Sequence, residues 1–165
     1  MKLIEGGFLI AATLLSGAAL GHGANDDEKA PAGRATAPVE EKAFGRSGDA
    51  KKATRAIKVD MSDRMRFAPA EIEVRQGETV RFIVRNTGKT MHEMVLGRMG
   101  DLKEHAALMR KFPGMEHDEP YMVHVAPGKS GALVWQFDRA GEFYYGCLIP
   151  GHFEAGMIGR IRVVP

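Results

Sequence analysis

Apolar and polar residues alternate along the segment Thr79–Asn86, and this alternation limits the fold more than any other feature of the chain. One face of the extended segment would carry Val80, Phe82 and Val84, and the other face would carry two arginines. Successive side chains of a strand point to opposite faces, so a period of two predicts a strand with one buried face and one face in water. Strands of this kind must cover their apolar faces with a second layer of structure.

Short segments with turn residues between them continue this pattern through the rest of the chain. We expect strands over residues 71–75, 79–86, 91–96, 121–125, 131–138, 142–147 and 157–164. Turn signals such as Gln76-Gly77, Pro127-Gly128 and Ala140-Gly141 separate several of them. The segment Asp101–Phe112 differs, because its apolar residues recur at helical spacing and Pro113-Gly114 follows it. About seven short strands with one short helical insertion predict an all-β fold, a two-sheet β-sandwich.

The composition excludes several other classes of protein. The 165-residue chain has 23 Lys and Arg residues against 21 Asp and Glu residues, and this net charge of +2 excludes a strongly basic nucleic-acid-binding protein as the first interpretation. The single cysteine excludes an intramolecular disulfide and a zinc site made of cysteines alone. The ten methionines and six histidines, by contrast, have side chains that soft or borderline metal ions prefer.

Residues 1–23 predict a signal peptide, so we expect the protein to be exported. An apolar run extends from Phe8 to Leu20 and is followed by small residues, and this run is too short for a membrane-spanning helix. The alternative interpretation is an uncleaved membrane anchor or a buried helix.

Residues 24–56 predict a flexible, disordered tether, which leaves residues 57–165 as the folded domain. The stretch holds mainly small residues and alternating charges, with one aromatic residue, Phe44. Such a segment cannot bury enough apolar surface to offset the entropy that is lost when it becomes ordered.

The turn region between the last two predicted strands holds the residues that carry chemistry. Cys147, His152 and Met157 are spaced as C-x4-H-x4-M, so one loop can bring a thiolate, an imidazole and a thioether around one ion. Two imidazoles, one thiolate and a weak axial thioether form the ligand set of a blue-copper site. His92, at the start of an earlier predicted strand, is the candidate for the second imidazole. Taken singly, each of these residues has a plainer interpretation as a core or loop residue, the cysteine above all.

Two longer stretches of sequence resemble a known family. The stretch Phe67–Phe82 and the stretch Gly141–Cys147, with the histidine and methionine downstream, are similar to plastocyanin and azurin-like cupredoxins. This resemblance covers about residues 57–165 and implies a Greek-key β-sandwich that holds a type 1 copper ion as its cofactor. It implies that the copper ligands are His92, Cys147, His152 and Met157.

A narrower resemblance suggests a function. The stretch that starts at His92 and the stretch Phe112–Pro120 resemble periplasmic copper-tolerance cupredoxins of the CopI type, some of which are green rather than blue. The resemblance implies a periplasmic protein that binds copper and transfers one electron in copper tolerance, with oxidation of Cu(I) as a further expectation. One residue departs from the pattern, because Glu93 stands where many small cupredoxins carry the Asn or Ser that ties their ligand loops together.

The alternative function is a plain electron shuttle between redox partners. A shuttle needs an apolar contact patch around an exposed histidine ligand, and Leu148, Ile149, Pro150 and Phe153 could supply one. The sequence has no Ser-His-Asp set, no phosphate-binding glycine loop and no paired catalytic carboxylates, so we assign no catalytic residues and leave open whether the protein is an enzyme. The expected partners are copper ions and a redox or copper-handling protein, with no nucleic acid and no membrane contact after signal cleavage.

A second group of soft donors lies in the insertion. Met115 and His117 are two residues apart, as are Met122 and His124, with a predicted turn between the two pairs. Thioethers and imidazoles suit Cu(I), so these four residues form a candidate auxiliary copper site. In the alternative interpretation, Met122 fills the core and the histidines are polar surface groups.

Overall fold

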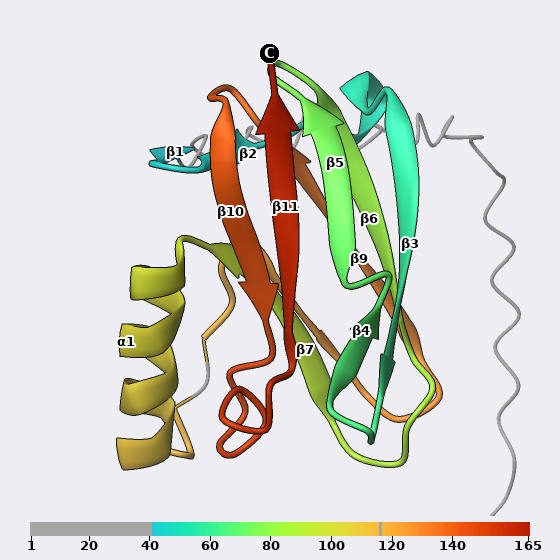
Figure 1. Ribbon diagram of the computed structural model, residues 1–165. Helices are drawn as coiled ribbons and strands as arrows, with labels where there is room; N and C mark the ends of the chain where they lie inside the picture. The colour runs from blue at the N-terminus through green and yellow to red at the C-terminus, as the bar shows by residue number, and fades with distance from the viewer. Residues whose placement is uncertain (1–40, 116) are drawn as a thin grey trace, which may run out of the picture. The chain divides into compact units, whose positions relative to one another are not determined.

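The computed structural model describes residues 41–115 and 117–165, which form two β-sheets and one α-helix (Figure 1). The predicted signal peptide and residues 24–40 of the predicted tether lie outside the described residues. Within the described part of the chain, no helix has the length and apolar composition needed to cross a membrane.

Eleven strands make up the two sheets. The six strands of the first sheet are, in spatial order, β1 (Glu41–Lys42), β2 (Gly45–Ser47), β9 (Ser130–Gln136), β6 (Thr79–Asn86), β3 (Arg55–Ser62) and β4 (Arg66–Ala68). The five strands of the second sheet are β5 (Glu71–Arg75), β11 (Ile158–Val164), β10 (Gly141–Gly146), β7 (His92–Gly97) and β8 (Met122–Val125). The helices are α1 (Met99–Lys111) and the short 3-10 helix η1 (Ala50–Lys52).

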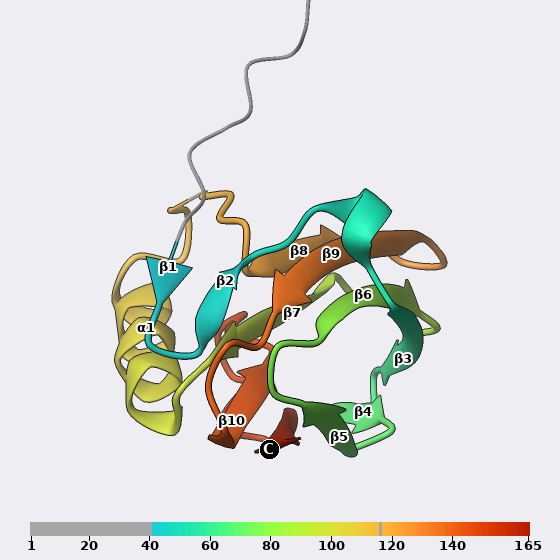
Figure 2. The same ribbon diagram turned by 90° about the horizontal axis from the view of Figure 1, so that it is seen from above.

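The two sheets form the predicted all-β Greek-key sandwich with one helical insertion, so this prediction is confirmed. The chain crosses from the second sheet to the first between β5 and β6, and it returns between β6 and β7. Strands β3 and β6 are parallel to each other, as are β5 and β11. Figure 2 looks along the strands and shows β6 and β9 on one side of the sandwich, with β10 and β5 on the other.

Strand β6, near the middle of the first sheet, confirms the alternation that the sequence predicts. Its residues Val80, Phe82 and Val84 are completely buried, and the two arginines between and after them are exposed. Phe82 meets Phe137 edge to face, with the ring centroids 6.2 Å apart. Burial of each such side chain stabilises the fold by about 1.5–3 kcal/mol, so the apolar face of β6 is a major part of the core.

Helix α1 covers the outer side of β7 and β10 (Figure 1). Its buried face consists of Leu102, Ala106 and Met109. This face packs in one cluster with Val95 of β7 and with Leu148 and Phe153 of the loop after β10. The helix begins two residues before the predicted start, Asp101, whose carboxylate instead binds Arg98 just outside the first turn. Because the core lies on one side and the helix on the other, all six residues of β7 are buried.

The folded domain begins earlier than the sequence predicts, because residues 41–56 belong to the sandwich rather than to a tether. Strand β2 pairs with β9, and Phe44 stacks on Trp135 with ring centroids 5.2 Å apart. The indole Nε1–H of Trp135 donates to the carbonyl oxygen of Phe44 at 3.0 Å. A Cβ atom on Gly45 would lie 2.1 Å from the carbonyl oxygen of Gln136, so only glycine allows this close approach. The packing of Phe44 on Trp135 therefore holds the otherwise polar segment 41–56 against the first sheet.

Replacing Phe44 by alanine is expected to lower the free energy of unfolding of the metal-free protein by about 3 kcal/mol, because truncation of a buried aromatic side chain leaves a cavity. Urea unfolding followed by circular dichroism measures this change. Arg46→Ala, which removes an exposed side chain of β2, is the matched control and should change the free energy by less than about 0.5 kcal/mol. Equal effects of the two substitutions would contradict the inclusion of this segment in the core.

Candidate metal centre

His92, the first residue of β7, is completely buried. Both nitrogens of a buried imidazole need partners. Its Nε2 atom lies 3.1 Å from Oδ1 of Asp63, and its Nδ1 atom lies 3.9 Å from Sγ of Cys147. The structure therefore brings the histidine that the sequence analysis selected to the single cysteine of the chain.

Main-chain hydrogen bonds close the loop between β10 and β11. The amide of Cys147 donates to the carbonyl of Met157 at 3.1 Å, and the amide of Met157 donates to the carbonyl of His152 at 3.1 Å. The amide of His152 donates to the carbonyl of Ile149 at 2.9 Å. Cys147 and Met157 are completely buried in one cluster, whereas His152 is half-buried. The C-x4-H-x4-M spacing thus forms a compact loop that holds the three predicted residues together.

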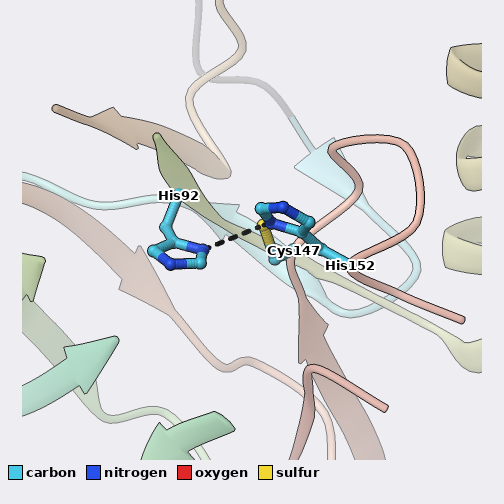
Figure 3. A group of neighbouring side chains, drawn as sticks. All are labelled: His92, Cys147 and His152. Atoms are coloured by element: carbon cyan, nitrogen blue, oxygen red, sulfur yellow. Dashed lines mark hydrogen bonds between the residues drawn. The ribbon is translucent and has the colours of Figure 1, made fainter. Parts of the chain in front are cut away.

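Figure 3 shows the side chains of His92, Cys147 and His152 gathered around one point. The Nδ1 atom of His152 lies 3.3 Å from the cysteine sulfur, and one donor atom from each of the three residues lies within 4.8 Å of the others. In the part of the chain that the structure describes, no other group of three His, Cys, Asp or Glu side chains meets this distance. Two imidazole nitrogens and one sulfur at such distances can bind one metal ion.

Burial controls the protonation of these donors. It raises the pKa of the Cys147 thiol to about 12, so the metal-free protein carries a neutral thiol at neutral pH. Burial also lowers the pKa of His152, as does the neighbouring His92, which leaves the His152 imidazole neutral with a lone pair for a metal. A metal ion must displace the thiol proton, and it then stabilises the thiolate. This set of soft and borderline donors, with the buried thioether of Met157 nearby, fits copper.

Glu93, the residue that departs from the small-cupredoxin pattern, joins β7 to the cysteine loop. Its buried carboxylate accepts a hydrogen bond from the amide of Leu148 at 2.8 Å, directly after the cysteine. Its second oxygen lies 2.8 Å from Nε2 of His124, the residue opposite it on β8. Burial raises the pKa of Glu93, although the His124 charge and the Leu148 amide oppose that rise. A carboxylate therefore holds the two ligand segments together at this position.

The structure separates the four residues of the predicted auxiliary site. Met122 is buried in the cluster under helix α1, as the packing interpretation predicts. Met115, His117 and His124 instead line an open hollow of about 690 Å³ that also borders the cysteine loop. His105 of α1, outside the predicted set, approaches His117 with 2.6 Å between the two Nε2 atoms. The donors at the hollow are thus the imidazoles of His117 and His124 and the exposed thioethers of Met91 and Met115.

The sequence analysis missed Asp63, the second neighbour of the buried imidazole. Asp63 lies 29 positions before His92, in the turn between β3 and β4. No local spacing connects the two residues, and an aspartate in a turn is common for reasons that concern the turn alone. Only the spatial approach of this turn to the start of β7 reveals the contact.

A family model and two relatives with similar sequences all point to copper-binding proteins. The model of the family "Copper binding proteins, plastocyanin/azurin family" matches residues 53–164. The copper-resistant cuproprotein CopI of Rubrivivax gelatinosus is 49% identical over 98% of this chain and 98% of its own length. The protein of the same name from Pseudomonas aeruginosa is 36% identical over 78% of this chain and 86% of its own length.

Solved structures show the same fold at lower sequence identity. Auracyanin B aligns with a TM-score of 0.61 and 21% identity, covering 73% of this chain and 96% of the auracyanin. The dithionite-reduced auracyanin of Roseiflexus castenholzii aligns with a TM-score of 0.59 and 20% identity, covering 68% of this chain and 98% of that protein. The arrangement of the two sheets is therefore shared with these proteins.

Glu93→Ala is expected to lower the free energy of unfolding of the metal-free protein by about 1–3 kcal/mol, because it leaves the buried amide of Leu148 without an acceptor. Glu93→Gln keeps an acceptor oxygen and is expected to retain most of the wild-type stability. Urea unfolding of both variants at neutral pH measures the difference. Equal destabilisation by the two substitutions would mean that the negative charge, rather than the hydrogen bond, supports the loop.

Proposed function

The chain belongs to the plastocyanin/azurin family of copper-binding proteins and is a cupredoxin of the CopI type, and from this we propose that it is a periplasmic type 1 copper protein that transfers one electron in copper tolerance. The observation that carries the proposal is the convergence of two imidazole nitrogens on one buried cysteine sulfur. The periplasmic location rests on the predicted signal peptide of residues 1–23.

We assign His92, Cys147 and His152 as the strong copper ligands and Met157 as the weak axial ligand. The first three are supported by the distances between their donor atoms, and Met157 by its burial and its main-chain hydrogen bond to the cysteine. Copper in such a set of ligands supplies one-electron redox chemistry with little rearrangement. The residues themselves supply a rigid frame, because the closed loop and the Glu93 contact hold the donor atoms in place.

The half-buried imidazole of His152 is the proposed route for the electron. His92 and Cys147 are completely buried, so partners cannot touch them directly. His152 lies on the loop between β10 and β11, whose tip includes the exposed Pro150 and Gly151. A redox partner that contacts this loop would come within reach of a ligand without opening the core.

The plain electron shuttle, the alternative function, has less support from the surface. Two of the four residues expected to form its apolar patch, Leu148 and Phe153, are buried under helix α1. The neighbouring hollow instead exposes Met91 and Met115, each more than two-fifths exposed. Exposed thioethers beside imidazoles favour a surface that handles copper over one that only docks a redox partner. The names of the relatives from Rubrivivax gelatinosus and Pseudomonas aeruginosa, copper-resistant cuproproteins, agree with this choice.

Cu(I) is the proposed substrate of this surface. Met115, His117 and His124 at the hollow would hold Cu(I), and one electron would pass from it to the site at Cys147, so that the ion leaves as Cu(II). The hollow and the ligand loop share a border at Ile149 and Pro150, which keeps this transfer short. The centre would regain its oxidised state by passing the electron to an electron-acceptor protein.

Cys147→Ala is expected to abolish the intense visible charge-transfer bands of the copper-loaded protein, because the thiolate donor is lost. Absorption spectroscopy after copper loading measures this directly. Met157→Leu is the matched control within the same loop and should keep the bands, since an axial thioether binds weakly. Bands that survive in Cys147→Ala would disprove the assignment of the ligands.

Cu(I) binding at the hollow can be tested in the Cys147→Ala background, where the main site is disabled. Replacing both His117 and His124 by alanine should weaken Cu(I) binding at least about tenfold, which is about 1.4 kcal/mol. Met122→Leu should leave the affinity unchanged, because Met122 is a core residue. Anaerobic competition titration with a Cu(I) chelator measures both. Affinity that is unchanged in the double histidine variant would leave only structural roles for these residues.

A further inference from the structure

We propose that Asp63 is a positioning residue of the copper centre, which holds His92 through its Nε2–H and lowers the reduction potential of the site. The inference rests on the proposed function, since it takes His92 as a copper ligand. It extends that function by assigning a specific carboxylate to the tuning of the centre.

The two nitrogens of His92 face different partners. Nδ1 lies on the side of Cys147, at 3.9 Å from the sulfur, and Nε2 lies 3.1 Å from Oδ1 of Asp63. A carboxylate only accepts hydrogen bonds, so Nε2 must carry a hydrogen, and the neutral ring then has its lone pair on Nδ1. The contact with Asp63 therefore fixes the tautomer that presents Nδ1 to a metal ion.

Main-chain and side-chain donors hold the carboxylate of Asp63 in this position. The amide of Lys89 donates to Oδ2 at 2.7 Å, and the hydroxyl and amide of Thr90 donate to Oδ1 at 2.9 and 3.3 Å. Three donors to one carboxylate favour its ionised form, because an ionised carboxylate offers only acceptor atoms. A Cβ atom on Gly88 would lie 2.1 Å from Oδ1, so the loop approaches this closely only because residue 88 is glycine.

A role restricted to the turn does not account for all of this arrangement. Asp63 would satisfy the amides of Lys89 and Thr90 without any contact to His92. The imidazole, however, is completely buried, and among the described residues the one other hydrogen-bonding neighbour of its Nε2 is the hydroxyl of Thr90, at 3.4 Å. The same carboxylate thus serves the loop and supplies the charged acceptor that the buried ring needs.

The charge of the carboxylate has a predictable effect on copper. A carboxylate that accepts from the remote nitrogen of a ligand histidine increases the basicity of the ligating nitrogen. A more basic nitrogen and a nearby negative charge stabilise Cu(II) more than Cu(I), because Cu(II) carries the larger positive charge. Asp63 therefore lowers the reduction potential, and its neutralisation should raise it.

The test compares Asp63→Asn with Asp60→Asn in the copper-loaded full chain. Asp60 is an exposed carboxylate on the same β-hairpin, so its removal controls for the general loss of one negative charge. In Asp63→Asn the affinity for Cu(II) relative to Cu(I) should fall about tenfold, which corresponds to a rise of about 59 mV in the reduction potential. Redox titration of the visible band measures this rise, and Asp60→Asn should show little of it.

A second variant keeps the charge and moves the carboxylate. Gly88→Ala should displace Asp63 from His92 and should also raise the reduction potential. If Asp63→Asn does not fold, this variant provides the test instead. Proton NMR of the metal-free protein gives a readout without copper: the Nε2–H signal of His92 should move upfield in Asp63→Asn, whose neutral amide oxygen is a weaker acceptor, and should be lost in Gly88→Ala, where the acceptor is displaced. Visible bands with an unchanged potential in either variant, or equal rises in Asp63→Asn and Asp60→Asn, would overturn the inference. Absence of the bands from the wild-type protein would instead refute the proposed copper site.

Discussion

The antiparallel register between β7 and β10 determines the geometry of the candidate metal centre. Gly146 pairs with Val95 at the end of this ladder, so Cys147 leaves β10 beside the first residues of β7. A register shift of one residue would turn every side chain of β7 to the opposite face. His92 would then face the helix, and Glu93 would place a carboxylate against the thiol. The ligand geometry therefore depends on the packing of helix α1 and the core against opposite sides of β7.

Local patterns in the sequence were sufficient to predict the seven strands β5 to β11 and the cysteine loop, whereas the strands β1 to β4 were not predicted. The alternation in β6 persists in the fold because the side chains of successive residues must separate between core and water. The spacing of Cys147, His152 and Met157 was informative because all three residues lie on one short loop that its own main-chain hydrogen bonds close. His92 lies 55 positions before the cysteine, so no local spacing connects them; its place at the start of a predicted strand made it a candidate, and the resemblance to a family then implied it as a ligand.

Features that depend on distant contacts could not be predicted in the same way. Phe44 lies in a polar segment, and nothing near it in the sequence indicates that Trp135, 91 positions away, offers a stacking site. Met122 belongs to an M-x-H pair that suggests metal binding, but β8 packs it beneath the helix. The acceptor for the buried ring of His92 comes from a turn between two strands of the other sheet. In each case the role of the residue depends on a contact with a residue that is distant in the sequence.

The strands run between two ends of the sandwich, and the ligand loop and the C-terminus lie at opposite ends (Figure 1). The C-terminus and β1 lie at one end, whereas the loop between β10 and β11 lies at the other (Figure 1). Strand β11 alone, with seven residues, spans roughly 23 Å between the two ends. A dye, fusion partner or solid support attached at Pro165 would therefore leave the ligand loop free to meet other proteins. For electrochemistry the same geometry is unfavourable, because immobilisation through the C-terminus would hold the metal centre a full strand length away from the electrode.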